Sequence, residues 1–155
     1  MPHLLIIGYG NPLLGDDAAG YQAAERLRLT LTGPDVEILA VHQLTPELSD
    51  PISRAARVIF IDAAATGDPG AIQQRPIDSS QDPGGFTHHA TPSALLALAK
   101  ALYGADPRAV LITVAGLDFG IGMELSAPVQ QALDRLVWLR VPELIANPDA
   151  AEWQA

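Results

Sequence analysis

The stretch LLIIGYGNPLLGDD, residues 4–17, decides the fold class of this chain. The run Leu4–Gly8 is short, continuously apolar and followed by glycines, which is typical of a strand buried on both faces. After the turn the apolar spacing becomes helical, with Ala19, Ala23 and Leu27 on one face. The stretch therefore predicts the strand, turn and helix that open an α/β unit.

The rest of the chain repeats this alternation of strands and helices. Further strands are expected at Val36–Val41, Val58–Asp62 and Val110–Ala115, with an edge strand over Ala71–Gln74. Helices are expected after Thr45-Pro46, Thr91-Pro92 and Ser126-Ala127-Pro128, because a capping residue followed by proline is typical of a helix start. This alternation predicts a mostly parallel sheet with helices on both faces, and a long loop from Ala63 to Gly85 that is either mobile or functional.

Composition limits the possible classes of protein. The 155 residues are 48% hydrophobic, and we expect residues 1–147 to form one domain and residues 148–155 a flexible tail. The net charge is −9 and the 9 Lys and Arg residues are scattered, so neither nucleic acid nor a membrane surface is an expected partner. The chain has 0 Cys, which excludes thiol nucleophiles and disulfides, and we expect a cytoplasmic protein without a membrane span.

Two carboxylates follow strands that should be neighbours. Asp17 comes after the first strand and Asp62 ends the third, and right-handed crossovers place these strands side by side at the switch point of the sheet, where ligands bind. Neighbouring strands lie only about 4.8 Å apart. Two carboxylates at that distance repel each other unless a cation or a proton lies between them. With His88 they form a plausible ligand set for a divalent metal.

Simpler interpretations exist for each of these residues. Asp16 and Asp17 are suited to stabilising the first turn of a helix, and for Asp16 this is the favoured reading. Asp62 could bond to neighbouring amides, and His88 and His89 could be ordinary loop residues. The glycine turn lacks the third glycine of a dinucleotide fingerprint, although its amides could hold an anion. A serine hydrolase is excluded because the chain has no G-x-S-x-G elbow.

The motifs taken together resemble the nickel–iron hydrogenase maturation endopeptidases. The resemblance spans most of the chain up to about Leu144 and rests on these segments: Gly8-Tyr9-Gly10-Asn11-Pro12-Leu13, Asp16-Asp17, Gly20, His42-Gln43-Leu44-Thr45-Pro46-Glu47-Leu48, Asp62-Ala63, His88, Thr91-Pro92 with Leu95-Leu96, Gly116-Leu117 and Leu125-Ser126.

That resemblance implies a three-layer α/β sandwich around a five-stranded, mainly parallel, twisted sheet. It implies that Asp17, Asp62 and His88 are the metal-contacting and catalytic residues of an aspartic-type, nickel-recognising endopeptidase. Its substrate would be the nickel-loaded precursor of a hydrogenase large subunit, which loses a short C-terminal extension. The nickel would be carried by the precursor, with zinc or cadmium able to substitute in vitro.

Several details of the mechanism follow as hypotheses. Tyr9, Asn11, Asp16 and Gln43 are candidate contacts to the precursor, and Asp16 or Asp62 could take a proton from water. A monomer that meets its substrate transiently is the default expectation. The alternatives are a related peptidase acting on another precursor, and a non-catalytic α/β module that binds a nucleotide or flavin phosphate at the sheet edge.

Overall fold

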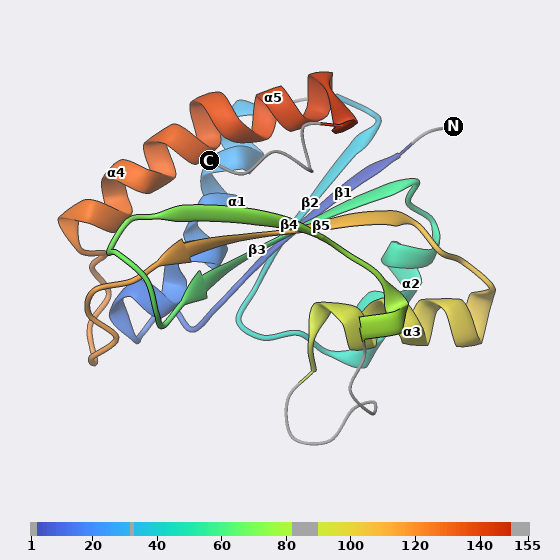
Figure 1. The fold of residues 1–155 in the computed structure, drawn as a ribbon, viewed down its shortest axis with the longest axis horizontal. Coiled ribbons are helices and arrows are strands. Elements are labelled where there is room, and N and C mark those ends of the chain that lie inside the picture. Colours follow the sequence, from blue (N-terminus) through green and yellow to red (C-terminus); the bar gives the residue numbers. More distant parts are fainter. Residues whose placement is uncertain (1–2, 32, 82–89, 150–155) are drawn as a thin grey trace.

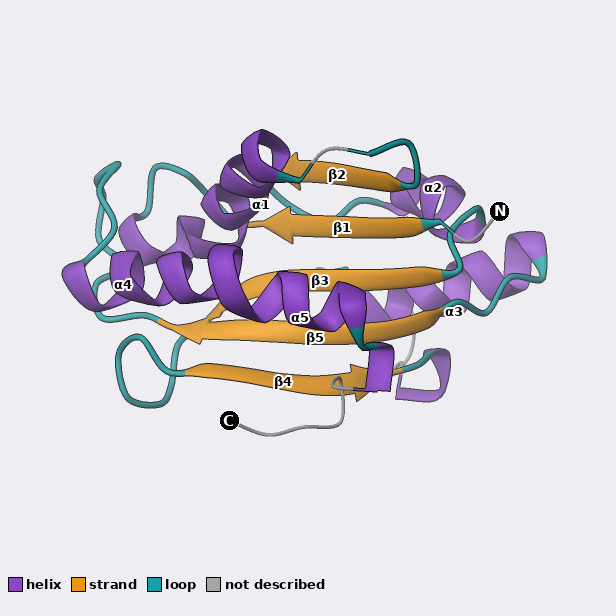
Figure 2. Ribbon diagram, turned by 90° about the horizontal axis from the view of Figure 1, so that it is seen from above, coloured by secondary structure: helices purple, strands orange, loops and turns teal. Residues whose placement is uncertain are grey.

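A five-stranded twisted sheet forms the centre of the molecule. The computed structural model describes residues 3–31, 33–81 and 90–149. The strands are β1 (Leu4–Tyr9), β2 (Val36–Val41), β3 (Arg57–Ala64), β4 (Ile72–Ile77) and β5 (Arg108–Ala115). Their order is β2-β1-β3-β5-β4, in which β4 alone is antiparallel to its neighbour (Figure 2). The predicted neighbours β1 and β3 are therefore paired, and the predicted edge strand is confirmed.

Helices cover both faces of this sheet. On one face lie α1 (Ala19–Thr30), α4 (Ala127–Arg135) and α5 (Val141–Ala146), and on the other α2 (Ser49–Ser53) and α3 (Pro92–Tyr103) (Figure 1). The short turns η1 (Gly15–Ala18), η2 (Pro46–Leu48) and η3 (Ser79–Gln81) connect these elements, and the π-helical turn η4 (Leu136–Arg140) joins α4 to α5. The predicted three-layer α/β sandwich is confirmed.

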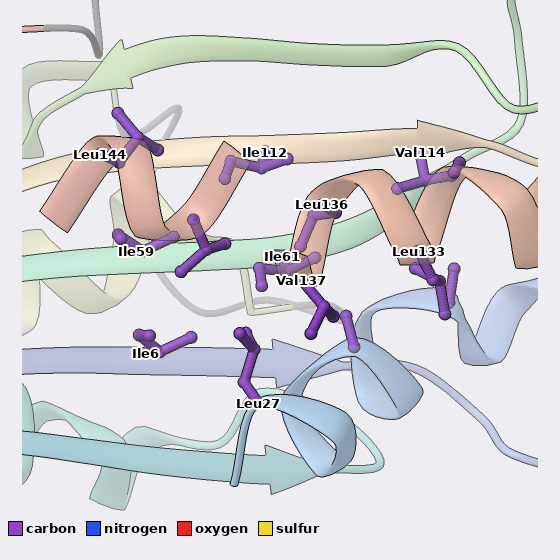
Figure 3. Packing of buried hydrophobic residues seen from close by; sticks show 14 of the residues in the cluster. Ile6, Leu27, Ile59, Ile61, Ile112, Val114, Leu133, Leu136, Val137 and Leu144 are labelled. Atoms are coloured by element: carbon purple, nitrogen blue, oxygen red, sulfur yellow. The ribbon is translucent and has the colours of Figure 1, made fainter. Parts of the chain in front are cut away.

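The core consists of two apolar clusters, one on each face of the sheet. Alternate residues of a strand point to opposite faces, so Ile6 packs under α1 and α4 while Leu5 and Ile7 pack toward α2 and α3. Figure 3 shows how strand residues of the first cluster meet Leu27 of α1 and Leu133 of α4. This burial on both faces is what the continuous apolar run at residues 4–7 predicted.

Helix α1 begins unusually close to the sheet. A Cβ added to Gly8 would lie 2.0 Å from the carbonyl oxygen of Gly20, and one added to Gly20 would lie 2.1 Å from that of Ile61. Only glycine at both positions allows the helix backbone to approach β1 and β3 in this way. The contact fixes the start of the helix, and with it Asp17, at the carboxyl ends of the two strands.

Some local predictions differ from the structure. Strand β3 continues to Ala64, so Asp62 lies within the strand rather than at its end. The predicted long loop from Ala63 to Gly85 contains β4 and η3, because the edge strand continues to Ile77. Thr45 makes no side-chain capping bond, whereas Thr91 accepts one from the amide of Ala94 at 3.1 Å.

Within the part of the chain that the structure describes, no helix is long and apolar enough to cross a membrane. Residues 150–155 of the predicted tail lie outside the described residues.

Candidate active site

Asp17 and Asp62 lie at the same edge of the sheet. Asp17 lies in η1, directly after the turn that follows β1, and one of its carboxylate oxygens accepts the Asn11 amide at 2.8 Å. Asp62 lies in β3, one residue beyond Ile61, which pairs with Gly8 of β1. The negative charge of Asp17 raises the pKa of Asp62, so the two groups are close enough to repel. The predicted pair of carboxylates at the switch point is present.

Asp62 is held in an environment that favours its protonated form. Burial is the largest cause and raises its pKa to about 6, and Asp17 adds to this rise. Hydrogen bonds from the Tyr9 hydroxyl and from the Ala63 amide, at 2.7 Å, act in the opposite direction. A carboxylate with this pKa is ionised at neutral pH but exchanges protons readily. A cation placed beside it would remove the repulsion from Asp17.

Tyr9 has a role that the sequence did not reveal. Its pKa is raised by burial, by the charge of Asp62 and by the hydrogen bond to that carboxylate. The phenol therefore stays protonated and acts as a donor that orients Asp62. From the sequence alone, Tyr9 is only a candidate substrate contact. Its position as the last residue of β1, whose partner strand carries Asp62, is the signal that could have indicated this bond.

The oxygen atoms of Asp17 and Asp62 suit a divalent metal, and the third predicted ligand, His88, lies outside the described residues. Two carboxylates that repel each other form a site for a cation, and their oxygens suit nickel, zinc or manganese together with an imidazole. His88 and the neighbouring His89 lie outside the described residues. Among the residues that are described, no three His, Cys, Asp or Glu side chains form a metal site. The catalytic and metal-binding assignments of Asp17, Asp62 and His88 therefore stay predictions.

Asp16 plays a structural part, unlike its neighbour. Its side chain is fully buried and accepts four hydrogen bonds: from the amides of Leu117, Asp118 and Ser126, and from the Ser126 hydroxyl. Burial acts to raise its pKa, but these bonds outweigh it and the pKa lies below the usual value. Asp16 does lie in the first turn of η1, as the helix-stabilising interpretation expected, but its carboxylate is committed to the loop after β5 and is not exposed to a substrate. Asp16 anchors the loop between β5 and α4.

Asn11 and Gln43 lie at the same edge as the two carboxylates. The Asn11 amide binds Asp17, and its side-chain oxygen accepts the amide of Leu13 at 2.9 Å. Gln43 is exposed and follows Val41, whose carbonyl accepts the Gly10 amide at 3.2 Å. The structure therefore places both predicted substrate contacts near the site, while their contact with a substrate stays a prediction.

A recess opens beside Asp62. It has a volume of about 410 Å³, and its walls include Tyr9 and Asp62 on the sheet and Thr91 and Ser93 at the start of α3. Arg75 of β4 forms a further part of the wall, and its positive charge opposes the rise in the pKa of Tyr9. Arg75 was not identified from the sequence, because its segment has no recognisable motif. The recess gives an extended peptide room beside Asp62.

Solved structures of [NiFe] hydrogenase maturation proteases are similar to this chain. Neither a protein-family model nor a curated protein matches the sequence. The [NiFe] hydrogenase maturation protease HycI from Thermococcus kodakarensis KOD1 shares 29% sequence identity, with a TM-score of 0.75 over 94% of this chain and 93% of that one. The hydrogenase maturating endopeptidase HybD from E. coli has a TM-score of 0.74 at 22% identity, over 93% of each chain.

A hydrogenase 2 maturation peptidase from Thaumarchaeota archaeon SCGC_AB-539-E09 is also similar. It has a TM-score of 0.67 at 24% identity, over 92% of this chain and 97% of that one. The similarity thus extends over nearly the whole length of each protein. The resemblance predicted from the sequence is confirmed, and this chain is a structural relative of the [NiFe] hydrogenase maturation proteases.

Proposed function

We propose that this chain is an endopeptidase that removes the C-terminal extension from the large-subunit precursor of a [NiFe] hydrogenase after nickel has been inserted. The observation that carries the proposal is the meeting of Asp17 and Asp62 at the carboxyl ends of β1 and β3. The similarity to HycI over nearly the whole chain supports the same activity. We further infer that the protein acts in the cytoplasm as a monomer.

The substrate would bring its nickel to the two carboxylates. Asp17 and Asp62, with His88, would hold the nickel ion of the precursor and place the scissile peptide beside it. Nickel held there would supply a Lewis acid, which would polarise the scissile carbonyl or activate a water. Zinc or cadmium would substitute for it in vitro. The recess beside Asp62 would receive the peptide that flanks the scissile bond.

Proton transfer falls to Asp62 rather than Asp16. Asp16 is fully buried, holds four hydrogen bonds and has a lowered pKa, so it is a poor proton acceptor. Asp62 has a pKa of about 6 and lies on the wall of the recess, where it can take a proton from the attacking water at neutral pH. The Tyr9 hydroxyl orients this carboxylate for the transfer.

The edge of the sheet is poorly suited to a phosphate. A nucleotide or flavin phosphate would meet the charges of Asp17 and Asp62, and the Asn11 amide of the glycine turn already donates to Asp17. These contacts favour a cation over an anion, so the peptidase is the better-supported function. A peptidase acting on a different precursor would share the same carboxylates.

The test compares two forms of one precursor. The purified chain is incubated with nickel-loaded and with nickel-free large-subunit precursor, and the C-terminus of each product is read by mass spectrometry. We expect cleavage of the nickel-loaded form only, and loss of that cleavage in Asp17→Ala, Asp62→Ala and His88→Ala. Cleavage at the wild-type rate in all three variants would end the proposal.

A further inference from the structure

Four large apolar side chains are exposed beside the candidate active site. Leu13 lies in the turn after β1 and is 57% exposed, while Leu117, Ile121 and Met123 in the loop after β5 are 60%, 95% and 72% exposed. We call this group the apolar platform. Figure 1 shows the two segments at the same end of the sheet, where β1 and β5 both finish.

The backbone under the platform is tightly held. The Gly15 amide donates to the Gly122 carbonyl and the Gly122 amide to the Leu13 carbonyl, both at 2.9 Å, and the Asp16 amide donates to the Asp118 carbonyl at 2.8 Å. Two loops that are about 100 residues apart in the sequence are thereby joined into one surface. The exposed side chains are presented from an ordered backbone.

The side chain of Asp16 also holds the loop after β5 in place. Its buried carboxylate accepts the amides of Leu117 and Asp118 at one end of the loop and the amide and hydroxyl of Ser126 at the other. A buried charge with four donors is a strong local constraint. The loop that these hydrogen bonds constrain carries Ile121 and Met123, whose side chains are exposed to solvent.

The platform is continuous with the candidate catalytic carboxylates. Asp17 accepts the Asn11 amide, the Asn11 side chain accepts the Leu13 amide, and the Leu13 carbonyl accepts the Gly122 amide between Ile121 and Met123. These bonds place the platform next to Asp17, so a folded protein whose C-terminal tail reaches Asp17 would lie beside the platform. Exposed apolar groups on an ordered backbone are typical of the anchor residues of protein interfaces.

Charge argues against two other occupants of this surface. The exposed carboxylates Asp118 and Glu124 lie in the same loop, and the whole chain has a net charge of −9. A second copy of the chain would bring identical acidic groups against these, and an anionic membrane would be repelled.

We propose that the apolar platform docks the folded body of the hydrogenase large-subunit precursor and so aligns its tail with Asp17 and Asp62. This inference rests on the proposed function and extends it to a second contact region, which holds the substrate without taking part in the cleavage. Asp16 is then a positioning residue that fixes the docking loop. The partner's surface opposite the platform should be apolar, with basic groups facing Asp118 and Glu124.

The experiment separates docking from chemistry. The double variant Ile121→Ser, Met123→Ser changes two exposed side chains and should fold normally. The control is Leu29→Ser, because Leu29 is 84% exposed and lies near the far end of α1. Initial rates of cleavage are measured over a range of concentrations of nickel-loaded precursor, and binding of the precursor to each variant is measured directly. We expect the double variant to raise KM and the dissociation constant about tenfold or more, with kcat unchanged, and the control to match wild type.

The possible failures can be told apart. If wild type cleaves the precursor and the double variant has the same KM and the same dissociation constant, docking at the platform is wrong while the proposed function stands. If wild type binds the precursor through Ile121 and Met123 but does not cleave it, the platform stands and the proteolytic function fails. If the chain alone forms a dimer that the double variant dissociates, the platform's partner is a second copy, and the proposal is overturned. Absence of both binding and cleavage in wild type would contradict both.

Discussion

Asp16 and Asp17 are adjacent in the sequence but have opposite surroundings. Asp16 is fully buried and accepts four hydrogen bonds, whereas Asp17 is half-buried, accepts the Asn11 amide and raises the pKa of Asp62 through its charge. Neighbouring residues of a 3-10 turn such as η1 project about 120° apart, so two adjacent carboxylates can serve different parts of a structure. The hydrogen-bond partners of each aspartate, and not the residue type, therefore decide whether it belongs to the candidate site.

Replacing Asp16 should destabilise the protein strongly. In Asp16→Ala, three backbone amides and the Ser126 hydroxyl lose their acceptor. Each unsatisfied buried donor costs about 1–3 kcal/mol, so we expect a loss of at least about 3 kcal/mol in the free energy of unfolding. Urea denaturation measures it. Asp17→Ala is the control and should lose about 1 kcal/mol, and equal losses in the two variants would contradict the anchoring role.

Asp62→Asn should stabilise the protein in a manner that depends on pH. The folded-state pKa of Asp62 is about 6, above its ordinary value of 3.8, so the folded state binds the proton more tightly than the unfolded state. Wild type therefore loses stability as pH rises from about 4 to about 6, by up to about 3 kcal/mol, and does not regain it at higher pH. The neutral amide avoids this loss.

Thermal unfolding at two pH values tests this sign. Asp62→Asn should melt several degrees above wild type at pH 7.5, and the difference should shrink toward pH 4. A difference in Tm that stays the same at both values would show that the carboxylate is not held in the proposed environment. Activity should fall in the same variant, since stability and catalysis oppose each other at this residue.

Single residues were only partly predictable from the sequence. Asp17 and Asp62 were placed together because strand order and crossover handedness determine which loops meet. The partners of Asp16 lie about 100 residues away in a loop without regular structure, and no local pattern indicates such a contact. The bond between Tyr9 and Asp62 was missed because it depends on the orientation of a side chain at the end of β1.

At the scale of elements, the contact between α1 and the strands positions the site. Gly8 and Gly20 leave space for the helix backbone to touch β1 and β3, and η1 carries Asp17 into place just before that contact. A wider separation would move Asp17 away from Asp62. The glycines are therefore requirements of the site as well as of the packing.

Gly20→Ala should disturb both the fold and the activity. Its Cβ would lie 2.1 Å from the carbonyl oxygen of Ile61 and 2.6 Å from that of Tyr9, and backbone atoms cannot yield as a flexible side chain can. Overpacking costs about 1–3 kcal/mol, and we expect at least the upper part of that range. Gly33→Ala is the matched control, since no atom lies within 4 Å of its added Cβ. Equal denaturation midpoints for the two variants would contradict the close approach.

Regular elements were the most predictable part of the molecule. Strand β2 has the predicted bounds, and the apolar positions of α1 at Ala19, Ala23 and Leu27 are all buried. The ends of helices and strands that depend on tertiary contacts were not predicted. The interruption of the last helix by η4 is one example, and the extension of β3 past Asp62 through its pairing with β5 is another.

The whole molecule places its chemistry at one edge of the sheet. Strands β1, β2, β3 and β5 end there (Figure 2). The segments that carry the candidate carboxylates and the apolar platform lie at or after these strand ends, and the recess is lined by Asp62. Two apolar clusters, one on each face, pack the helices against the sheet that carries this edge. A substrate protein would meet one continuous surface rather than separate sites.

Divalent cations should stabilise the folded chain. Nickel or zinc at millimolar concentration should raise Tm. The free energy of unfolding should rise by about 2.7 kcal/mol if the ion is present at 100 times its dissociation constant. Nucleotide at the same concentration should have no effect, because Asp17 and Asp62 repel phosphate. Differential scanning fluorimetry measures both. Stabilisation by nucleotide alone would favour the non-catalytic module.

The central claim is that Asp17 and Asp62 act together on the nickel-loaded precursor. The most direct measurement is the rate of C-terminal processing, read by mass spectrometry, for Asp17→Asn, Asp62→Asn and the double variant, with Asp35→Asn as an exposed control. We predict that each single variant loses more than about 100-fold in rate, that the double variant loses little more, and that the control keeps the wild-type rate. Normal processing by either single variant, in a protein shown to be folded, would contradict the account.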